Sequence, residues 1–301
     1  MKVSVVLMTF NHEPYIAQAL DSALSQDLDG RYEVLVTEDC STDRTREILR
    51  EYESRQPETI RLLLSPRNLN TNEVLRRGIE AAQAPYVALL DGDDYWTSPR
   101  KLATQVRRLE EQPELSMSFH NVQVVYEDAS TKPHPFHLER PNRRLSAAIP
   151  KPVSTLSDLV GGNFIQTCSA VFRRDRLPDL PEWYDGLQLG DWPLYVLLAE
   201  RGPIAYVDEI LGVYRVHSRG HWSAYLSRLQ RVQDVEDIVR IYDVLDRHLR
   251  FRYTDRISAS VQAFCGYAAE TLERDGRHEE ADRVRRLADR DAPPPADPPR
   301  P

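Results

Sequence analysis

Short apolar segments alternate with amphipathic segments over the first third of this chain. The apolar segments predict strands at residues 3–10, 32–37, 60–64 and 86–90. The amphipathic segments predict helices that begin near Pro14, after Ser41 and Thr42 as N-caps, and at residues 73–82 and 101–111. Because strands that alternate with helices form parallel βαβ units, the sequence predicts a doubly wound, mainly parallel α/β sheet.

The rest of the chain is predicted to add strands and then to become helical. Further strands are expected at residues 115–119, 122–126, 167–172, 205–207 and 210–214, a helical turn at 157–160 and a helix at 191–200. From Trp222 onward, apolar residues recur every three or four positions, which is typical of amphipathic helices. These helices could cover the sheet, bind a second copy of the chain or touch a membrane surface.

Two segments outside these elements are irregular. Residues 127–151 contain four prolines, and a connection this long is usually a functional lid or a disordered segment. The last residues are rich in proline and are expected to be disordered. We therefore divide the chain into a sheet domain at residues 1–221, a helical region at 222–290 and a disordered, proline-rich tail at 291–301.

Composition and charge exclude several classes of protein. A net charge of −8 disfavours a nucleic-acid-binding surface, and no apolar run of about 18 residues is present that could span a membrane. Three widely spaced cysteines favour a reducing compartment, so we expect a cytoplasmic protein without disulfides. The first residues predict a strand rather than a signal peptide. The glycine-rich phosphate-binding fingerprints of dinucleotide-binding and P-loop proteins are absent.

An acidic cluster follows the fourth predicted strand. Asp91, Asp93 and Asp94 are three carboxylates within four residues. Ligands of open α/β sheets bind outside the carboxyl ends of the strands, and a divalent cation such as Mg²⁺ or Mn²⁺ would relieve the repulsion between these charges. The alternative is an ordinary Asp-rich turn in which Gly92 adopts a positive φ.

Four separated stretches carry a resemblance to a known family. They are VSVVLMTFN, VTEDCSTDRT, YVALLDGDDYW and GDWPLYVLLAERG with the YRVH that follows it. In this order and spacing they resemble the signature of the family 2 glycosyltransferases of the GT-A fold, over roughly residues 3–217. The resemblance implies a GT-A-like sheet that binds a nucleoside diphosphate sugar with a divalent metal ion and transfers the sugar with inversion.

The resemblance also implies which residues bind the donor. Thr9 and Asn11 in the first turn match positions that hold the nucleoside. Glu38 and Asp39 do so in the second turn, where the family commonly has two aspartates. Asp39 could accept a hydrogen bond from a base N–H, or could only stabilise a helix N-terminus. Arg76 could reach the nucleoside or the phosphates, or could be a solvated helix residue.

The acidic cluster matches the DxD pair of the family. By that resemblance Asp93 is the more direct ligand of Mn²⁺ or Mg²⁺, Asp91 shares the metal and lies nearer the ribose, and Gly92 belongs to the donor site. A divalent cation would stabilise the charge that develops on the diphosphate leaving group. His217 matches a histidine that helps to bind metal or diphosphate, or it serves the structure alone. Asp94 is expected to bond backbone amides of the turn.

Asp191 matches the aspartate that acts as general base in inverting members of the family. A sugar hydroxyl is too weak an acid to ionise near neutral pH, so a carboxylate must take its proton as the new bond forms. Gly190 stands where the family usually has Glu. Asp191 could also be the N-cap of a helix in which Pro193 is the second residue.

The predicted function is metal-dependent, inverting transfer of a sugar from a nucleoside diphosphate donor, with uridine as the favoured base, to an acceptor hydroxyl. The acceptor could be a saccharide, a lipid-linked glycan, a natural product or a peptide, and the C-terminal helices could support a homo-oligomer. A catalytically silent nucleotide-sugar-binding protein and a nucleotidyltransferase are the alternatives.

Trp96, Trp192 and Trp222 could stack on sugar rings or pack in the core. Arg219 and His221 could close over phosphate oxygens.

Overall fold

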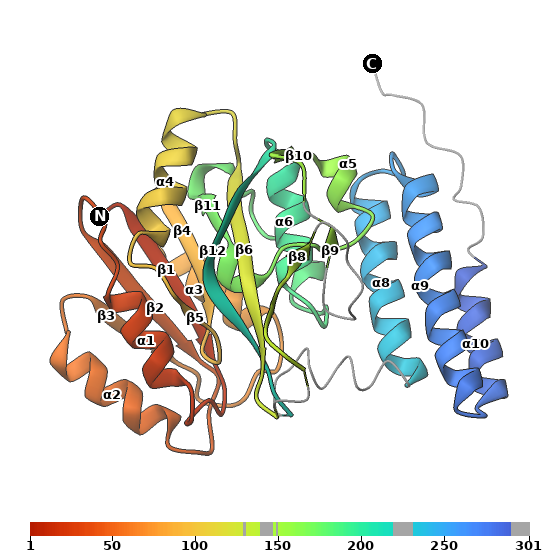
Figure 1. The fold of residues 1–301 in the computed structure, drawn as a ribbon, viewed down its shortest axis with the longest axis horizontal. Helices are drawn as coiled ribbons and strands as arrows, with labels where there is room; N and C mark the ends of the chain where they lie inside the picture. Colours follow the sequence, from red (N-terminus) through yellow and green to blue (C-terminus); the bar gives the residue numbers. More distant parts are fainter. Residues whose placement is uncertain (129–130, 139–146, 149, 219–230, 290–301) are drawn as a thin grey trace.

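A mixed sheet with helices on both faces forms the centre of the molecule (Figure 1). The computed structural model describes residues 1–128, 131–138, 147–148, 150–218 and 231–289. Parts of the irregular segment at 127–151, the domain boundary at 221, the tail at 291–301, and Arg219, His221 and Trp222 lie outside these residues. The last helices form a layer beside the sheet, at the right of Figure 1.

Four parallel strands make the first half of the sheet. They are β1 (Val3–Thr9), β2 (Tyr32–Glu38), β3 (Ile60–Leu64) and β4 (Tyr86–Asp91), in the spatial order β3-β2-β1-β4. β1 pairs with both β2 and β4, and its Thr9 lies opposite Glu38 while its Met8 lies opposite Asp91. The carboxyl ends of these strands therefore meet at one edge of the sheet, where ligands of such sheets bind.

The second half of the sheet mixes parallel and antiparallel strands. β11 (Val171–Arg173) is antiparallel to both β4 and β6 (Met117–Tyr126), and β12 (Ile204–Val216) is parallel to β6. The shorter strands are β5 (Tyr95–Trp96), β7 (His134–Pro135), β10 (Val153–Ser154) and the separate pair β8 (His137–Leu138) and β9 (Ala147–Ala148). The long strands thus pair mostly in parallel, which confirms the predicted class of sheet.

Helices cover both faces of the sheet. α1 (Ile16–Leu24), α2 (Thr45–Arg55) and α4 (Lys101–Glu111) share one hydrophobic cluster with Val5 and Leu7 of β1. α3 (Glu73–Ala81), α5 (Leu156–Leu159) and α6 (Asp191–Ala199) share a second cluster with Val6 of β1. Successive side chains of a strand point to opposite faces, so a strand between two helix layers requires a continuous apolar run. Short 3₁₀ turns lie at Thr167–Ser169, Arg174–Arg176 and Glu182–Tyr184.

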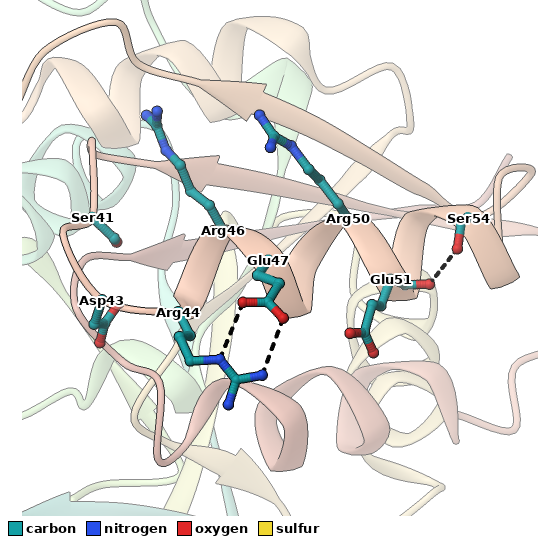
Figure 2. A pocket seen from close by; sticks show the side chains of 8 residues that line it. All are labelled: Ser41, Asp43, Arg44, Arg46, Glu47, Arg50, Glu51 and Ser54. Atoms are coloured by element: carbon teal, nitrogen blue, oxygen red, sulfur yellow. Dashed lines mark hydrogen bonds and ion pairs between the residues drawn. The ribbon is translucent and has the colours of Figure 1, made fainter.

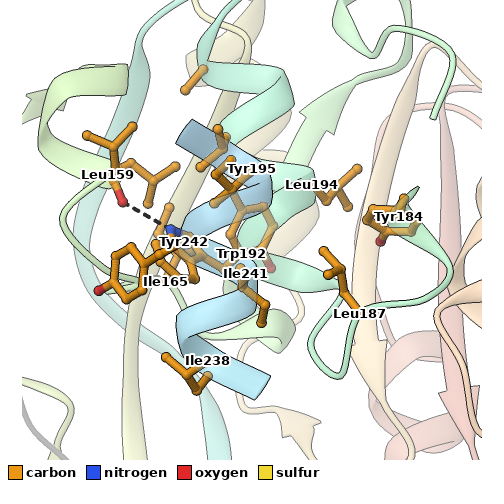
Figure 3. Packing of buried hydrophobic residues seen from close by; sticks show 14 of the residues in the cluster. Leu159, Ile165, Tyr184, Leu187, Trp192, Leu194, Tyr195, Ile238, Ile241 and Tyr242 are labelled. Carbon is orange, nitrogen blue, oxygen red and sulfur yellow. Dashed lines mark hydrogen bonds between the residues drawn. The ribbon is translucent and has the colours of Figure 1, made fainter. Parts of the chain in front are cut away.

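The C-terminal helices α8 (Val232–His248), α9 (Thr254–Arg274) and α10 (His278–Ala288) pack against the sheet domain. Their buried residues belong to the same hydrophobic cluster as those of α6. Figure 3 shows Trp192 of α6 against Tyr242 of α8, with ring centroids 4.7 Å apart, and the Trp192 N–H donating to the Leu159 carbonyl at 3.0 Å. The apolar face predicted for these helices therefore covers the domain. None of the described helices is long and apolar enough to cross a membrane.

Several predicted elements differ from those observed. The strands predicted at 115–119 and 122–126 are one strand, β6, and those at 205–207 and 210–214 are one strand, β12. Register shifts after Val207 mark bulges in β12, which explains why its apolar pattern is interrupted. The first part of the strand predicted at 167–172 is a 3₁₀ turn, and α10 lies within the helical region predicted at 222–290.

The first two helices begin later than predicted. α1 begins two residues after Pro14, which lies in a turn. α2 begins at Thr45, whose backbone N–H donates to Asp43 Oδ1 at 3.0 Å. Asp43 therefore satisfies the helix end, and the predicted caps Ser41 and Thr42 are left to bond the first βα turn.

Two of the tryptophans that could stack on sugars belong to the core instead. Trp96 and Trp192 are both buried. Trp96 also donates its N–H to the Cys168 carbonyl at 2.7 Å, so its polar atom is satisfied inside the protein. All three cysteines are free thiols, in agreement with the prediction of a chain without disulfides.

Candidate active site

Three turns meet at the carboxyl edge of β1, β2 and β4. The backbone N–H of Asp39 donates to the Thr9 carbonyl at 3.0 Å, and that of Gly92 donates to the Met8 carbonyl at 2.8 Å. These bonds continue the parallel pairing just beyond the strands. The fold therefore brings together four predicted site residues, Thr9, Asp39, Asp91 and Gly92.

Gly92 is required by a close approach and not by a left-handed backbone. It is absent from the glycines with positive φ, so the positive φ that the alternative of an ordinary Asp-rich turn assigned to Gly92 is wrong. A Cβ at this position would lie 2.7 Å from Thr9 Oγ1 and 2.8 Å from His12 Nδ1. Both distances are too short for real contacts, so any larger residue would push the first turn away from the acidic cluster.

Asp93 lies between two histidines from distant parts of the chain. Its Oδ2 is 2.9 Å from His217 Nε2 and 3.6 Å from His12 Nε2. Burial by itself raises the pKa of Asp93, but the charge of His12 and the hydrogen bond from His217 outweigh burial and lower that pKa below its usual value. The Asp93 carboxylate is thus kept ionised, which is the form that a metal ligand must take.

The two histidines are oriented by contacts on their other sides. The His217 side chain is only 1% exposed, and its ring centroid lies 4.7 Å from that of Tyr15. His12 Nδ1 is 3.2 Å from Thr9 Oγ1. Among the described residues, His217 Nδ1 has no hydrogen-bond partner. Packing rather than a second hydrogen bond therefore directs His217 Nε2 toward Asp93.

Asp191 is the first residue of α6. Gly190 is the N-cap and Pro193 the third helical residue, so the N-cap role considered for Asp191 is wrong. Its Oδ2 accepts a hydrogen bond from Asn163 Nδ2 at 2.8 Å. Burial raises the pKa of Asp191 to about 6, although hydrogen bonds from the Trp192 amide and from Asn163 act to lower it. Such a carboxylate is ionised near neutral pH and is more basic than an ordinary aspartate, as a general base should be.

Asp91 lies in the field of both other carboxylates. Burial, followed by the charges of Asp93 and Asp191, raises the pKa of Asp91 well above its usual value, while a hydrogen bond from Thr167 opposes the rise. The charge of Asp191 reaches Asp91 and raises its pKa because the fold brings the first residue of α6 near the end of β4. Like charges held this close are costly unless a proton or a cation compensates them.

The acidic edge offers part of a coordination shell for a metal ion. Among the residues that the structure describes, no three His, Cys, Asp or Glu side chains are arranged to hold an ion by themselves. Of the predicted set Asp91, Asp93 and His217, only Asp93 and His217 are in direct contact. Mg²⁺ is usually bound by one or two carboxylates together with substrate phosphates and water. The residues therefore fit a metal ion that binds with a diphosphate.

Arg215 of β12 connects the acidic turn after β4 to the second half of the sheet. Its backbone N–H donates to Asp94 Oδ1 at 2.8 Å, and its guanidinium donates to the Asp93 carbonyl and, at 2.7 Å, to Gln18 Oε1. The guanidinium also lies 4.7 Å from the ring centroid of Tyr15. The Asp94 side chain thus binds a backbone amide, as expected, but one from a distant strand rather than from its own turn.

Asn11 joins the first βα turn to the second. It has a φ of 54°, a conformation that asparagine tolerates better than most residues. Its N–H donates to Ser41 Oγ at 2.9 Å, and its Oδ1 accepts from the Thr42 N–H at 2.8 Å. The side-chain oxygen of Asn11 is therefore already engaged with the chain.

Asp39 is nearly buried and holds the loop that follows β3. Its two carboxylate oxygens accept hydrogen bonds from the backbone N–H groups of Leu69, at 2.8 Å, and Asn70, at 3.0 Å. Asn70 takes a φ of 45°, at a place where the sequence lacks a glycine. A carboxylate has about four acceptor positions, so these two bonds leave Asp39 able to accept another from a nucleobase.

Two residues predicted to bind the donor are held by other parts of the chain. Glu38 is fully buried, and its carboxylate accepts from the Ser41 N–H and from Arg46 Nε. Arg76 donates to Asp185 Oδ1 at 2.8 Å, so it is neither a solvated arginine nor a free phosphate ligand. It ties α3 to the segment before α6. We therefore leave both residues out of the donor contacts proposed below.

A shallow cavity of about 560 Å³ lies along α2 and the turn before it. It is lined by Ser41, Asp43, Arg44, Arg46, Glu47, Arg50, Glu51 and Ser54 (Figure 2). Arg44 and Glu47 are paired there through two hydrogen bonds of 3.1 Å. None of the predicted site residues lines this cavity, so it is not the donor site.

His12 and Asn163 belong to the site although no role was predicted for them from the sequence. His12 lies three residues after the end of β1, and the rule that drew attention to Asp91, a polar residue close beyond a buried strand, applies to it as well. Asn163 lies in a loop outside any regular element and carries no local signal. Only the fold brings it to Asp191.

Comparison with known proteins identifies the family. Residues 4–177, more than half of the chain, match the sequence model of the glycosyl transferase family 2. The chain belongs to glycosyltransferase family 2. Uncharacterized proteins of Mycobacterium tuberculosis and Mycobacterium bovis are each 38% identical to this family 2 chain over 227 residues, which is 75% of this chain and 62% of theirs. It therefore spans about three fifths of the length of these relatives.

Solved structures support the fold of this family 2 protein. Residues 1–349 of TarS from S. aureus, in complex with UDP-GlcNAc, give a TM-score of 0.57 at 17% identity and cover 95% of this chain and 91% of that one. The mannosyltransferase PcManGT from Pyrobaculum calidifontis, in complex with GDP-Man and Mn²⁺, gives 0.57 at 18% identity and covers 95% and 84%. At these identities the likeness concerns the fold alone, and it confirms the predicted GT-A-like architecture.

Proposed function

We propose that this protein is a metal-dependent, inverting glycosyltransferase that uses a nucleoside diphosphate sugar. The observation that supports this most is the meeting of three carboxylates, Asp91, Asp93 and Asp191, at one edge of the sheet, where burial and then the charges of Asp93 and Asp191 raise the pKa of Asp91. Their environments push their pKa values in different directions, which is a mark of carboxylates with different chemical roles. Asp93 stays charged, and Asp191 can take up a proton.

The donor would bind with its diphosphate at Asp93 and His217 and its sugar toward Asp191. A bound Mn²⁺ or Mg²⁺ would supply Lewis-acid stabilisation of the leaving diphosphate. Asp93 and His217 would hold that ion, and Asp91 with Gly92 would face the ribose and the sugar. Asp191, oriented by Asn163, would accept the proton of the attacking acceptor hydroxyl. A single displacement of this kind inverts the anomeric centre and needs no covalent intermediate.

The nucleoside would lie over the first and second βα turns, between Thr9, Asn11 and Asp39. Asp39 would read the base through an acceptor position that its bonds to the chain leave open. TarS was solved with UDP-GlcNAc and PcManGT with GDP-Man, so the fold accommodates both bases, and we favour uridine. Three free cysteines agree with a cytoplasmic location.

The decisive experiment measures nucleotide binding and product together. UDP and GDP are titrated against the protein by calorimetry, with and without Mn²⁺, and donor turnover is followed by release of the free nucleotide. We expect binding that requires Mn²⁺ and that Asp93→Asn abolishes, while Asp29→Asn, an exposed carboxylate change, leaves it intact. Release of nucleoside diphosphate supports the transferase.

Each alternative gives a different result in the same experiment. Release of pyrophosphate would identify a nucleotidyltransferase. Tight nucleotide binding without any turnover of UDP-GlcNAc, UDP-glucose or GDP-mannose would identify a silent binding protein. Binding by Asp93→Asn equal to that of the parent would remove the metal assignment.

A further inference from the structure

A second cavity lies beside Asn163, the residue that donates a hydrogen bond to Asp191. Its volume is about 500 Å³, within the usual range for small-molecule sites, and it is lined by Asp158, Gly161, Gly162, Asn163, Arg256, Ala259, Ser260 and Ala263. The lining therefore comes from α5, from the segment after it and from one face of α9. Asn163 belongs to this lining and also donates to Asp191 Oδ2 at 2.8 Å. One side chain thus connects the cavity to the proposed general base.

The cavity has a floor of small residues held by the C-terminal helices. Tyr242 of α8 donates its hydroxyl proton to the Gly161 carbonyl at 3.1 Å. Gly162 has a φ of 149°, which residues with a side chain rarely adopt. A Cβ on Gly161 would lie 3.4 Å from both Arg256 Nε and Ser260 Oγ, so these two polar groups converge on the glycine backbone. The backbone of Gly161 and Gly162 is therefore exposed to the cavity without a side chain of its own.

The charges that line the cavity do not cancel. Asp158 Oδ1 accepts from Lys151 Nζ at 2.7 Å, and its Oδ2 accepts from the Thr155 N–H at 2.9 Å. Its negative charge is therefore compensated by its own segment. Arg256 is exposed to solvent, and within the described part of the chain its guanidinium makes no hydrogen bond or ion pair with the protein. The cavity is left with one uncompensated cation beside neutral hydrogen-bonding groups.

We propose that this cavity binds a saccharide unit of the acceptor that carries a carboxylate or phosphate group. The inference rests on the proposed function, because it takes the side of Asp191 next to Asn163 as the direction from which the acceptor arrives. Arg256 binds the anionic group through paired N–H donors. Ser260 and Asn163 form hydrogen bonds with ring hydroxyls, and the two glycines allow the sugar ring to approach the backbone.

The lining also argues against other acceptors. A lipid chain or an aromatic natural product would need large apolar or aromatic side chains, and the cavity is lined by glycine, alanine and polar residues only. A neutral saccharide would use the hydroxyl partners but would leave Arg256 without a counter-charge. The uncompensated guanidinium therefore selects an acidic sugar over its neutral analogue.

The test compares matched probes on the full chain. Methyl β-glucuronide, methyl β-glucoside and glucose 6-phosphate are each titrated by protein-observed NMR, with UDP and Mn²⁺ at saturating concentration so that the donor site is occupied. The two methyl glycosides differ only in the carboxylate, and the phosphate probe tells which acidic group is preferred. We expect at least one acidic probe to bind about tenfold more tightly than methyl glucoside.

Two variants and two controls identify the place of binding. Arg256→Gln is expected to remove the preference for acidic probes, and Ala263→Phe is expected to block all three by filling the cavity. Arg274→Gln and Gln262→Phe change exposed positions of the same helix outside the lining and should bind like the parent. All four variants should bind UDP as the parent does.

The outcomes separate this inference from the proposed function. Equal binding of acidic and neutral probes, absence of binding for all three, or preference that survives Arg256→Gln overturns the acidic acceptor site. Each of these can occur in a protein that binds UDP and Mn²⁺ normally. Failure of the parent protein to bind UDP would overturn the proposed function instead.

Discussion

At the scale of single residues, the site depends on carboxylates with unequal proton affinities. Burial raises the pKa of Asp191 to about 6, whereas His12 and His217 lower the pKa of Asp93. Both groups are aspartates at the same edge of one sheet. The difference comes from their neighbours, because Asp191 has neutral hydrogen-bond donors and Asp93 has two imidazoles.

Replacing Asp191 with Asn should lower turnover far more than donor affinity. The general base acts in the transition state, and its loss typically reduces turnover by about 10²–10⁴-fold. Asn is close in size and can keep a contact with Asn163, so the fold should persist. Steady-state transfer assays with UDP affinity measured in parallel check this. A loss of turnover below about tenfold would contradict the role of base.

The raised pKa of Asp191 means that protonation of this side chain favours the folded state. The stabilisation of the folded state by this proton is therefore present at about pH 4 and is lost as the pH rises through 6.

Transfer by the parent enzyme should fall as the pH drops below about 6, because protonated Asp191 cannot accept the proton of the acceptor hydroxyl. A pH profile of turnover measures this fall. In Asp191→Asn the residual turnover should no longer show this acidic limb.

Lys101 provides a separate test of how burial shifts a pKa, at a residue outside the proposed active site. Its ammonium is fully buried, lies 4.1 Å from the ring centroid of Trp96 and has no hydrogen-bond partner among the described residues. Burial lowers the pKa of Lys101 to about 7. The unfolded chain therefore holds a proton that the folded chain gives up between pH 7 and 10, and stability rises with pH over this interval.

Lys101→Met should accordingly stabilise the protein at pH 7, by about 2–4 kcal/mol after allowance for the lost cation–π contact. The gain should shrink as the pH approaches 10. Chemical denaturation at pH 7 and at pH 9.5 measures it, with Arg107→Met on the exposed face of α4 as the control. A destabilised Lys101→Met at pH 7 would show that the buried ammonium is stabilising as a cation.

At the scale of elements, the acidic turn is positioned by β12 as much as by β4. β4 ends at Asp91, but Asp94 and the Asp93 carbonyl are both bound by Arg215 of β12. His217 follows β12 directly and supplies the contact to the Asp93 side chain. A strand late in the chain therefore completes a site that begins at the end of an early one.

Arg215→Lys should weaken Mn²⁺-dependent binding of UDP while the protein stays folded. A lysine has one ammonium group and cannot donate to both the Asp93 carbonyl and Gln18 across the planar fork that Arg215 provides. We expect a loss of roughly 1–2 kcal/mol in UDP affinity, measured by calorimetry. Arg107→Lys is the matched control, and a parental affinity for Arg215→Lys would show that the turn holds its shape without this strand.

At the scale of the whole molecule, the C-terminal helices and the sheet domain share one core. Buried residues of α6, α8, α9 and α10 form a single hydrophobic cluster, in which Trp192 contacts Tyr242 (Figure 3). Removing those helices would expose this apolar surface to water. The helices therefore contribute to the stability of the domain as well as to the cavity beside Asp191.

The full chain should consequently unfold in one cooperative transition. We expect the calorimetric and van't Hoff enthalpies of unfolding to agree. A chain that ends at residue 218 should be insoluble or aggregate, because the buried face of α6 would lose its cover. Two separate transitions, or a soluble and folded truncated chain, would contradict the shared core.

Local patterns in the sequence were sufficient for the class of fold. The predicted strands at the ends of which Thr9, Glu38 and Asp91 lie are all present, because continuous apolar runs of this length have few other stable arrangements. Element boundaries were less predictable. The bulges in β12 and the 3₁₀ turn at Thr167–Ser169 depend on contacts with neighbouring strands, which local propensity does not contain.

The alternating α/β order and the position of the acidic cluster at a strand end follow from residues close together in the chain, and the family follows from the order and spacing of four short motifs, so all three could be predicted without the structure. Only the tertiary structure decided which side chains surround that cluster. His217 was predicted from the family resemblance, but its contact with Asp93 and the contacts of His12 and Asn163 depend on segments that are distant in the chain. Glu38 and Arg76 are bonded to partners that the sequence did not indicate. The pKa of Asp191 is raised by burial and modulated by hydrogen bonds from Trp192 and Asn163, so its raised value exists only in the folded chain.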